Sequence, residues 1–220
     1  MLRESTEHAM DWCENTMSML REKQFEACEK RLSEYSTVGL FSGEATDADA
    51  QRLLEHSYYA TEEPEGALTT LETLRARVMA QLETEATVLS PAESDLLERL
   101  LMADGQLTIN LWDETAPAEA LIYRLWCGFT RQSEEEITLE LPVGLREKLL
   151  LYLHSETCQD TKERLFRFDA TIHGLLYIAG FLHSAQPVDF FMQDVICDRG
   201  PLAARLAVRY LKAQFEYSQD

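Results

Sequence analysis

Asp169 and His173 lie four residues apart within a stretch that has the apolar spacing of a helix, so a carboxylate and an imidazole share one helix face. Such a pair can ligate a metal ion or provide a general base oriented by a carboxylate. Helical metal sites commonly carry Glu-x-x-His or His-Glu-x-x-His, and neither motif occurs. We therefore predict no cofactor. Asp169 and His173 remain the centre of an alternative, a helical enzyme or a metal- or ligand-binding domain.

The other residues with catalytic chemistry do not form a recognisable motif. His154 and Cys158 are also four residues apart, but nothing nearby supplies two further zinc ligands. The loop from Gly39 to Gly43 has the wrong spacing for a nucleophile elbow, and no glycine-rich phosphate-binding loop occurs. We name no catalytic residue. Enzymatic activity stays open, with a non-enzymatic role favoured, because helical enzymes need not carry short motifs.

The segment from Arg199 to Phe215 differs in charge from the rest of the chain, since it has four basic residues and no acidic one. Arg205, Arg209 and Lys212 follow one another at intervals of four and three residues, so they share one helix face. Arginine is suited to bidentate contacts with carboxylate or phosphate groups. Two interpretations stay open: a binding site for an acidic partner, or a helix that neutralises the acidic N-terminal half.

Two aromatic residues outside that segment are further candidates for contact with a partner. Phe41 belongs to an apolar loop, with Val38 and Leu40, that must either pack against the protein or meet another molecule. Tyr58 and Tyr59 are adjacent, and adjacent residues on a helix point about 100° apart, so we expect them to be unequally buried. The predicted binding surface therefore combines Phe41 and Tyr58 with the three basic residues of the last helix.

The net charge of −19 disfavours direct binding to nucleic acid, because an acidic surface repels phosphate backbones. Residues 1–110 hold 9 basic and 22 acidic residues, whereas residues 111–220 hold 11 and 17. Solubility is the simplest explanation of this excess. An acidic inhibitor that imitates DNA is a second alternative function, although the acidic residues are scattered over helix faces and do not form one run.

The cysteine pattern and the N-terminal residues indicate a cytoplasmic protein. The cysteines are odd in number, widely spaced and without a Cys-x-x-Cys pair, which is typical of reduced thiols; they are Cys13, Cys28, Cys127, Cys158 and Cys197. No apolar signal segment follows Met1. The longest apolar run, Gly174 to Leu182, is far shorter than the roughly 20 residues of a membrane span, so we expect it in the core and expect no membrane partner.

Apolar residues recur at intervals of three and four along most of the chain, which predicts helices. Ser90 to Glu93 reads as a capping box with proline at the first helical position, and Thr46 precedes two early acidic residues. The expected helices cover residues 5–35, 46–60, 65–85, 91–111, 116–132, 142–154, 161–183, 187–197 and 201–217.

Only the segment 136–141 alternates polar and apolar residues as a strand does, so we expect at most one short extended segment. The sequence thus predicts an all-α fold, as a multi-helix array or an irregular bundle of about eight or nine helices. The helix rhythm resembles a tetratricopeptide array, but the signature residues of that repeat are absent. We expect a single helical domain, 1–220, with an acidic lobe at 1–133 and an apolar lobe at 142–220.

The function that fits these observations best is a non-enzymatic protein-interaction module: an adaptor, a regulator or a chaperone-like binder. The absence of a catalytic signature, the groove-building rhythm of the helices and the strong acidity favour it. The expected partner is another protein. The sequence leaves the identity of the partner and the oligomeric state open.

Overall fold

The computed structural model describes residues 22, 23, 25–28, 30, 32, 39–60, 69–183 and 185–214, with only the backbone of 213 and 214. The chain divides into two compact units. The first comprises Met1–Ala76 and Leu96–Pro142, and the second Arg77–Asp95 and Val143–Asp220. Residues 77–95, which the sequence placed in the N-terminal lobe, therefore group with the C-terminal part of the chain.

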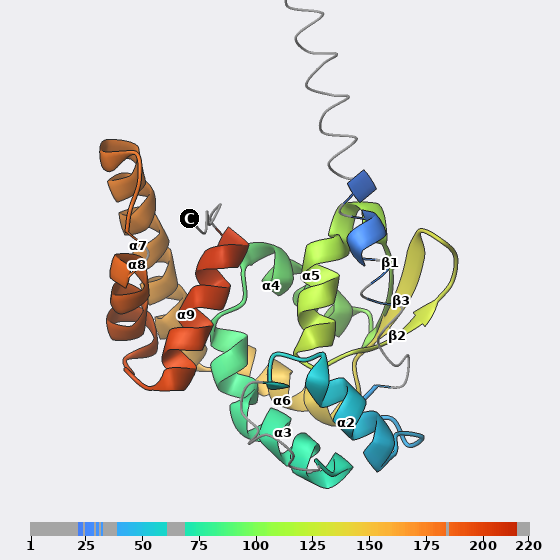
Figure 1. Ribbon diagram of the computed structural model, residues 1–220. Helices are drawn as coiled ribbons and strands as arrows, with labels where there is room; N and C mark the ends of the chain where they lie inside the picture. The colour runs from blue at the N-terminus through green and yellow to red at the C-terminus, as the bar shows by residue number, and fades with distance from the viewer. Residues whose placement is uncertain are drawn as a thin grey trace, which may run out of the picture. The chain divides into compact units, whose positions relative to one another are not determined.

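The fold is mostly helical with one small antiparallel sheet, which confirms the predicted fold class (Figure 1). Beyond residue 46 the helices are α2 (Asp47–Glu55), α3 (Leu71–Thr87), α4 (Pro91–Met102), α5 (Leu111–Tyr123), α6 (Val143–Leu153), α7 (Glu156–Ala179), α8 (Ala185–Phe190), the π-helix η2 (Phe191–Ile196) and α9 (Pro201–Gln214). The strands are β1 (Gln106–Asn110), β2 (Gly128–Arg131) and β3 (Glu136–Glu140).

Two helix starts follow the sequence signals that predicted them. The backbone N–H of Ser90 donates to Glu93 Oε2 at 2.8 Å, and the N–H of Glu93 donates to Ser90 Oγ at 3.2 Å. Thr46 and Asp49 make the same reciprocal pair at the start of α2. Each capping box satisfies backbone donors that the first helical turn leaves without a partner.

The predicted extended segment is confirmed as β3, the central strand of a sheet in the order β1-β3-β2. Its Ile137 and Leu139 are buried, and the residues between and beside them are more exposed, as the alternation of side chains along a strand requires. Thr108 and Thr138 are cross-strand partners whose hydroxyl oxygens lie 2.8 Å apart. α5 lies against this sheet (Figure 1).

The prediction of helix over residues 106–110 was wrong, because these residues form β1. α4 ends at Met102 because Asp104 and Gly105 adopt φ angles of 60° and 86°, in the left-handed region that ends helices. The N–H of Gly105 donates to the carbonyl of Leu100 at 2.9 Å and closes the last turn. The chain then runs into β1, so Gly105 ends the helix and does not bend it.

The prediction of helix over 128–132 was wrong for a similar reason. α5 begins at Leu111, where Asn110 Oδ1 accepts the N–H of Trp112 at 2.8 Å, and it ends at Tyr123. Leu125 then adopts a φ of 58°, and β2 begins at Gly128. A helical pattern of apolar residues continues through this turn, so periodicity alone does not reveal it.

In the second unit α7 begins five residues earlier than expected. Ser155 Oγ accepts the N–H of Cys158 at 3.2 Å and caps a helix whose first turns consist of the polar residues that we expected as a loop. The helix ends at Ala179, followed by Gly180 with a φ of 77°. Figure 1 shows α7, α8 and α9 beside one another. Their core consists of Val88, Phe168, Ile172, Phe191, Val195, Leu206, Ala207, Tyr210 and Leu211.

The predicted first helix lies mostly outside the described residues; those of its residues that are described are helical. Cys13, Val38 and residues 61–68 also lie outside that part of the chain. None of the helices in the described part has both the length and the apolar character that a membrane-spanning helix requires.

Candidate functional site

Asp169 lies on the inner side of α7 and joins this helix to α9. Its Oδ2 accepts a hydrogen bond from Tyr210 Oη at 2.7 Å, and its Oδ1 is buried without a hydrogen bond to any described residue. Burial raises the pKa of Asp169, although the bond from Tyr210 and the nearby charge of His173 act in the opposite direction. His173 itself is exposed. The carboxylate is therefore engaged in packing two helices.

No metal centre is evident in the described ranges: they contain no group of three His, Cys, Asp or Glu side chains that could hold a metal ion. His154 Nδ1 lies 2.7 Å from the carbonyl oxygen of Leu150, and Cys158 is buried. Burial raises the pKa of Cys127 to about 12, so this thiol stays protonated and is a poor nucleophile.

The three basic residues of α9 differ in their surroundings. Arg209 Nη2 forms an ion pair with Glu85 Oε2, and Glu85 is only 2% exposed. Arg205 is half-buried, whereas Lys212 is exposed. Arg209 therefore compensates a buried carboxylate inside the second unit, and Lys212 is the member of the set whose side chain faces solvent.

Phe41 and Tyr58 belong to the first unit, whereas the basic residues of α9 belong to the second. The loop with Phe41 packs against the protein: Leu40 is buried, and Arg75 donates to the carbonyl oxygens of Leu40 and Ser42 at 2.9 and 3.0 Å. Phe41 and Tyr58 themselves are half-buried. The ring of Tyr58 meets the ring of Tyr123 edge-on at 5.7 Å.

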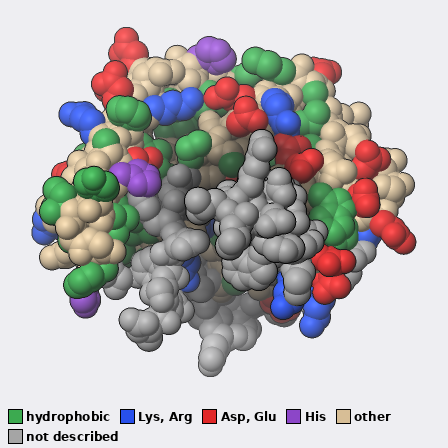
Figure 2. All heavy atoms as spheres, turned by 90° about the horizontal axis from the view of Figure 1, so that it is seen from above, with side chains coloured by type: hydrophobic (Ala, Val, Ile, Leu, Met, Phe, Trp, Pro, Cys, Tyr) green, Lys and Arg blue, Asp and Glu red, His purple; other side chains and the backbone are tan. Residues whose placement is uncertain are grey.

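Three of the most exposed apolar side chains lie at and just beyond the end of α7, where the sequence predicted core. Tyr177, Ile178 and Phe181 of the run Gly174–Leu182 are 92%, 84% and 78% exposed, and Phe166 is 75% exposed. The expectation that this run is buried was therefore wrong: none of its nine residues is buried, and Leu175, Leu176 and Leu182 are half-buried. Figure 2 shows hydrophobic side chains gathered at its left margin, where Figure 1 places α7 and α8.

These side chains belong to one stripe along the outer side of α7, which we call the α7 stripe. It comprises the exposed residues Phe166, Ala170, Gly174, Tyr177 and Ile178 of the helix and Phe181, which follows the left-handed Gly180 beyond the helix end. The helical members are spaced as on one helix face, and they span about 18 Å at 1.5 Å per residue. The middle of the stripe consists of the small residues Ala170 and Gly174. The space beside Gly174 is open, because a Cβ added there would meet no atom within 4 Å.

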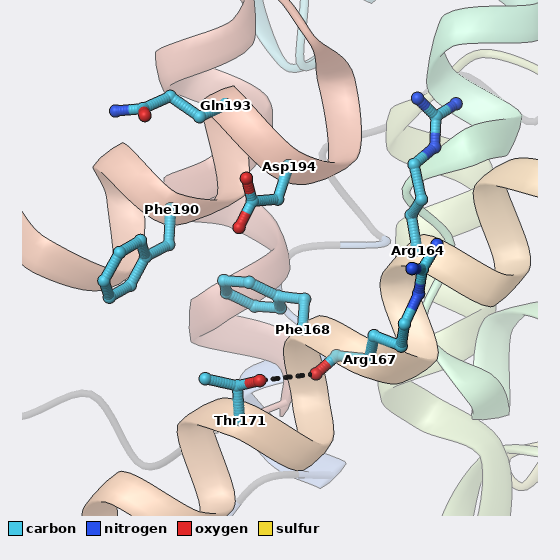
Figure 3. Close-up of a pocket in the computed structure, with 7 residues that line it drawn as sticks. All are labelled: Arg164, Arg167, Phe168, Thr171, Phe190, Gln193 and Asp194. Carbon is cyan, nitrogen blue, oxygen red and sulfur yellow. Dashed lines mark hydrogen bonds between the residues drawn. The ribbon is translucent and has the colours of Figure 1, made fainter.

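A pocket lies beside the stripe, between α7 and the turn from α8 into η2 (Figure 3). Its volume is about 440 Å³, and its lining consists of Arg164, Arg167, Phe168, Thr171, Phe190, Gln193 and Asp194. Figure 3 shows the two arginines on one side, Asp194 and Phe190 on the other, and Phe168 between them. All seven belong to the second unit.

The chain matches no family model, no curated protein and no solved structure. The sequence did not single out the α7 stripe or the pocket. A signal for the stripe was present, since a helix that is apolar on all sides must either be fully enclosed or leave an apolar face exposed.

Proposed function

We propose that the protein is a non-enzymatic interaction module whose α7 stripe binds an amphipathic helix of another protein. The observation that carries this proposal is the exposure of four large apolar side chains, three on one face of α7 and one just beyond its end: Phe166, Tyr177, Ile178 and Phe181. They expose about 600 Å² in total, at 150–250 Å² for a large side chain, which equals the largest apolar patches of typical monomers. Patches of that size commonly bind another protein.

The shape of the stripe favours a helix as its partner. Large side chains stand at both ends, while Ala170 and Gly174 leave the middle low. Small residues at a crossing point allow two helix axes to approach closely, and the distance between packed helices depends on those side chains. Apolar anchors spaced along one helix face are the usual way in which an amphipathic helix is recognised.

The charge around the stripe defines the partner further. From Phe166 to Phe181 the charged residues are Arg167, which is exposed, and Asp169, which is turned toward Tyr210. The outer side of this helix therefore presents a cation and no acidic group, although the whole chain carries −19. A partner helix with an acidic residue beside its apolar face would pair with Arg167.

The cytoplasm remains the compartment that we propose. Cys127 and Cys197 are free thiols, which suits a reducing environment.

A crosslinking experiment with two matched variants tests the proposal. Tyr177 is replaced by the photoreactive residue p-benzoylphenylalanine in the full chain, which is illuminated in cells of its native host. We expect one main adduct whose crosslinked peptide, identified by mass spectrometry, has an apolar helix face with a flanking acidic residue. Adding Gly174→Leu fills the open middle of the stripe and should abolish the adduct, while the exchange of glycine for leucine favours the helix.

Gly144→Leu is the matched control, because a Cβ at Gly144 also meets no atom within 4 Å and Gly144 belongs to a different helix, α6. It should leave the adduct intact. An adduct that survives Gly174→Leu, or that forms equally from a probe at the exposed Glu83, would contradict the proposal. An adduct between two copies of the chain would replace the heterologous partner by self-association.

A further inference from the structure

The pocket between α7 and η2 has the size and the chemistry of a ligand site, and it shares Arg167 with the surface of the proposed function. Its volume of about 440 Å³ lies within the range of about 300–1,000 Å³ that small-molecule pockets occupy. One wall is π-helical, and π-helical turns occur frequently at functional sites. In η2, Phe191 and Val195 are buried, whereas Gln193 and Asp194 remain exposed at the pocket.

One end of the pocket is cationic. Arg164 is held in place, because its Nη1 donates to Cys197 Sγ at 3.0 Å and its Nη2 donates to Thr161 Oγ1 at 3.1 Å. Its Nε is buried and makes no hydrogen bond with the residues that the structure describes. Arg167 follows one turn later, and its guanidinium group makes no ion pair or hydrogen bond in the described part of the chain. A fixed arginine and an uncommitted one therefore stand side by side on one helix.

The other end of the pocket is anionic. Asp194 is exposed, and its carboxylate makes no hydrogen bond or ion pair with any residue in the described ranges. Figure 3 shows this carboxylate on the opposite side of the pocket from the two guanidinium groups. The buried ring of Phe168 lies between the two ends, and Phe190, 43% exposed, stands at the rim. Opposite charges thus line one cavity without neutralising one another.

We propose that this pocket binds a small zwitterion of about the size of a dipeptide. Its carboxylate would bind Arg167 and Arg164, its ammonium group would bind Asp194, and an apolar side chain would cover Phe168 and Phe190. Arginine pairs with carboxylates through charge-assisted hydrogen bonds, and an ammonium group supplies three donors for Asp194. A zwitterion has no net charge, so the −19 of the chain does not repel it as it repels a simple anion.

Three related probes test the two ends of the pocket separately: the dipeptide Gly-Phe, its N-acetyl derivative without the ammonium group, and its C-terminal amide without the carboxylate. Binding to the full chain is followed by ¹⁵N NMR titration. We expect Gly-Phe to shift the amide signals of Thr171 and Gln193 and to bind more tightly than either derivative, by about tenfold for each lost charged contact.

Two substitutions complete the test. Arg167→Gln should weaken Gly-Phe about tenfold but leave the affinity for the amide unchanged, because the amide lacks the group that Arg167 binds. Asp194→Asn should weaken Gly-Phe but leave the N-acetyl derivative unchanged. Arg199→Gln, an exposed arginine of the same unit that does not line the pocket, is the control and should change nothing. Thermal melts confirm that each variant is folded.

The proposal is overturned if Gly-Phe causes no shift at 20 mM, a concentration about twentyfold above a dissociation constant of 1 mM. It is also overturned if Arg167→Gln and Asp194→Asn weaken all three probes alike, since the two ends would then not recognise separate groups.

Discussion

Two nine-residue stretches that are rich in apolar residues differ in how far their side chains are buried. The run Leu121–Phe129, in the first unit, is almost entirely enclosed; its buried members are Leu121, Ile122, Arg124, Leu125, Trp126, Cys127 and Phe129. The run Gly174–Leu182, in the second unit, contains no charged residue, yet Tyr177, Ile178 and Phe181 are among the most exposed side chains described. Hydrophobicity along the sequence therefore does not decide burial here.

The difference follows from the backbone that each run adopts. Leu121–Phe129 passes from the end of α5 through a turn into β2. Because the backbone changes from helix to turn to strand, side chains on all parts of this stretch can face the core. Its one charged residue is enclosed as well: the Arg124 guanidinium stands 5.3 Å from the ring of Tyr58 and 5.7 Å from that of Trp126. Gly174–Ala179 is the end of a regular helix, and successive residues turn by about 100°, so one side must face away from the core.

The sharpest test of this contrast is one truncation in each run. Trp126→Ala should lower the free energy of unfolding by about 4 kcal/mol, because Trp126 is 1% exposed and its removal leaves a cavity. Phe181→Ala should change it by less than about 0.5 kcal/mol, because the ring already stands in water. Urea denaturation measures both values. Equal losses in the two variants would mean that both runs are enclosed.

The inner side of the second unit is held by a buried ion pair, which gives the next largest effect. Arg209→Ala removes the ion pair between Arg209 and the buried carboxylate of Glu85, and breaking such a pair costs about 3 kcal/mol. Lys212→Ala, three residues further on the same helix, should cost less than about 0.5 kcal/mol because Lys212 is exposed. Urea denaturation of both variants makes the comparison.

A double variant separates the cost of removing one partner from the net contribution of the ion pair to the free energy of unfolding. Glu85→Leu with Arg209→Leu should recover most of the stability, because replacing both buried charges by apolar groups removes the uncompensated one. If Arg209→Ala and Lys212→Ala were equally mild, Arg209 would not compensate Glu85, and a role in binding a partner would gain support.

Asp169 provides a smaller, pH-dependent effect. Burial raises its pKa, so the folded state binds the proton more tightly than the unfolded state does. Ionised Asp169 therefore costs stability above its folded pKa, and the cost disappears as the pH falls through that pKa toward and below 3.8, the ordinary value of an aspartate. Asp169→Asn should be more stable than the natural chain at pH 7, by at most about 1 kcal/mol, since Asn can still accept from Tyr210 Oη.

Urea denaturation between pH 7 and pH 3 measures this difference. The advantage of Asp169→Asn should vanish at the acidic end. A variant that is less stable at pH 7 would mean that the charge-assisted bond from Tyr210 outweighs the cost of burial.

Much of the fold could be predicted from local signals. The capping boxes at Thr46 and Ser90 and the period of two in β3 each depend on neighbouring residues, and the structure contains all three. The strands β1 and β2 could not be predicted, because the left-handed turns at Gly105 and Leu125 interrupt apolar patterns that otherwise continue as helices. Their pairing with β3 is also a contact between distant residues.

The candidate site was less predictable than the fold. Arg209 and Asp169 were identified from their spacing on a helix, but their partners Glu85 and Tyr210 lie 124 and 41 residues away in the sequence. The pocket likewise joins residues of α7 with residues of η2. Spacing along one helix shows which side chains share a face and does not show what that face meets.

The smallest expected effect bears most directly on the α7 stripe. Tyr177→Ser with Ile178→Ser removes the two most exposed large side chains of the stripe. Both side chains are exposed to solvent in the folded protein, so they make few contacts that unfolding would break. Each substitution should therefore change the free energy of unfolding by less than about 0.5 kcal/mol. Serine has a helix propensity close to those of isoleucine and tyrosine, so the helix itself is not penalised.

Urea denaturation at two protein concentrations tenfold apart completes this measurement. A loss of several kcal/mol at both concentrations would show that the stripe is enclosed by another part of the same chain. A loss that grows with concentration would show that a second copy covers it, because association stabilises the folded state by mass action. No loss at either concentration leaves the stripe free in the isolated protein, as a surface that binds the helix of a different protein requires.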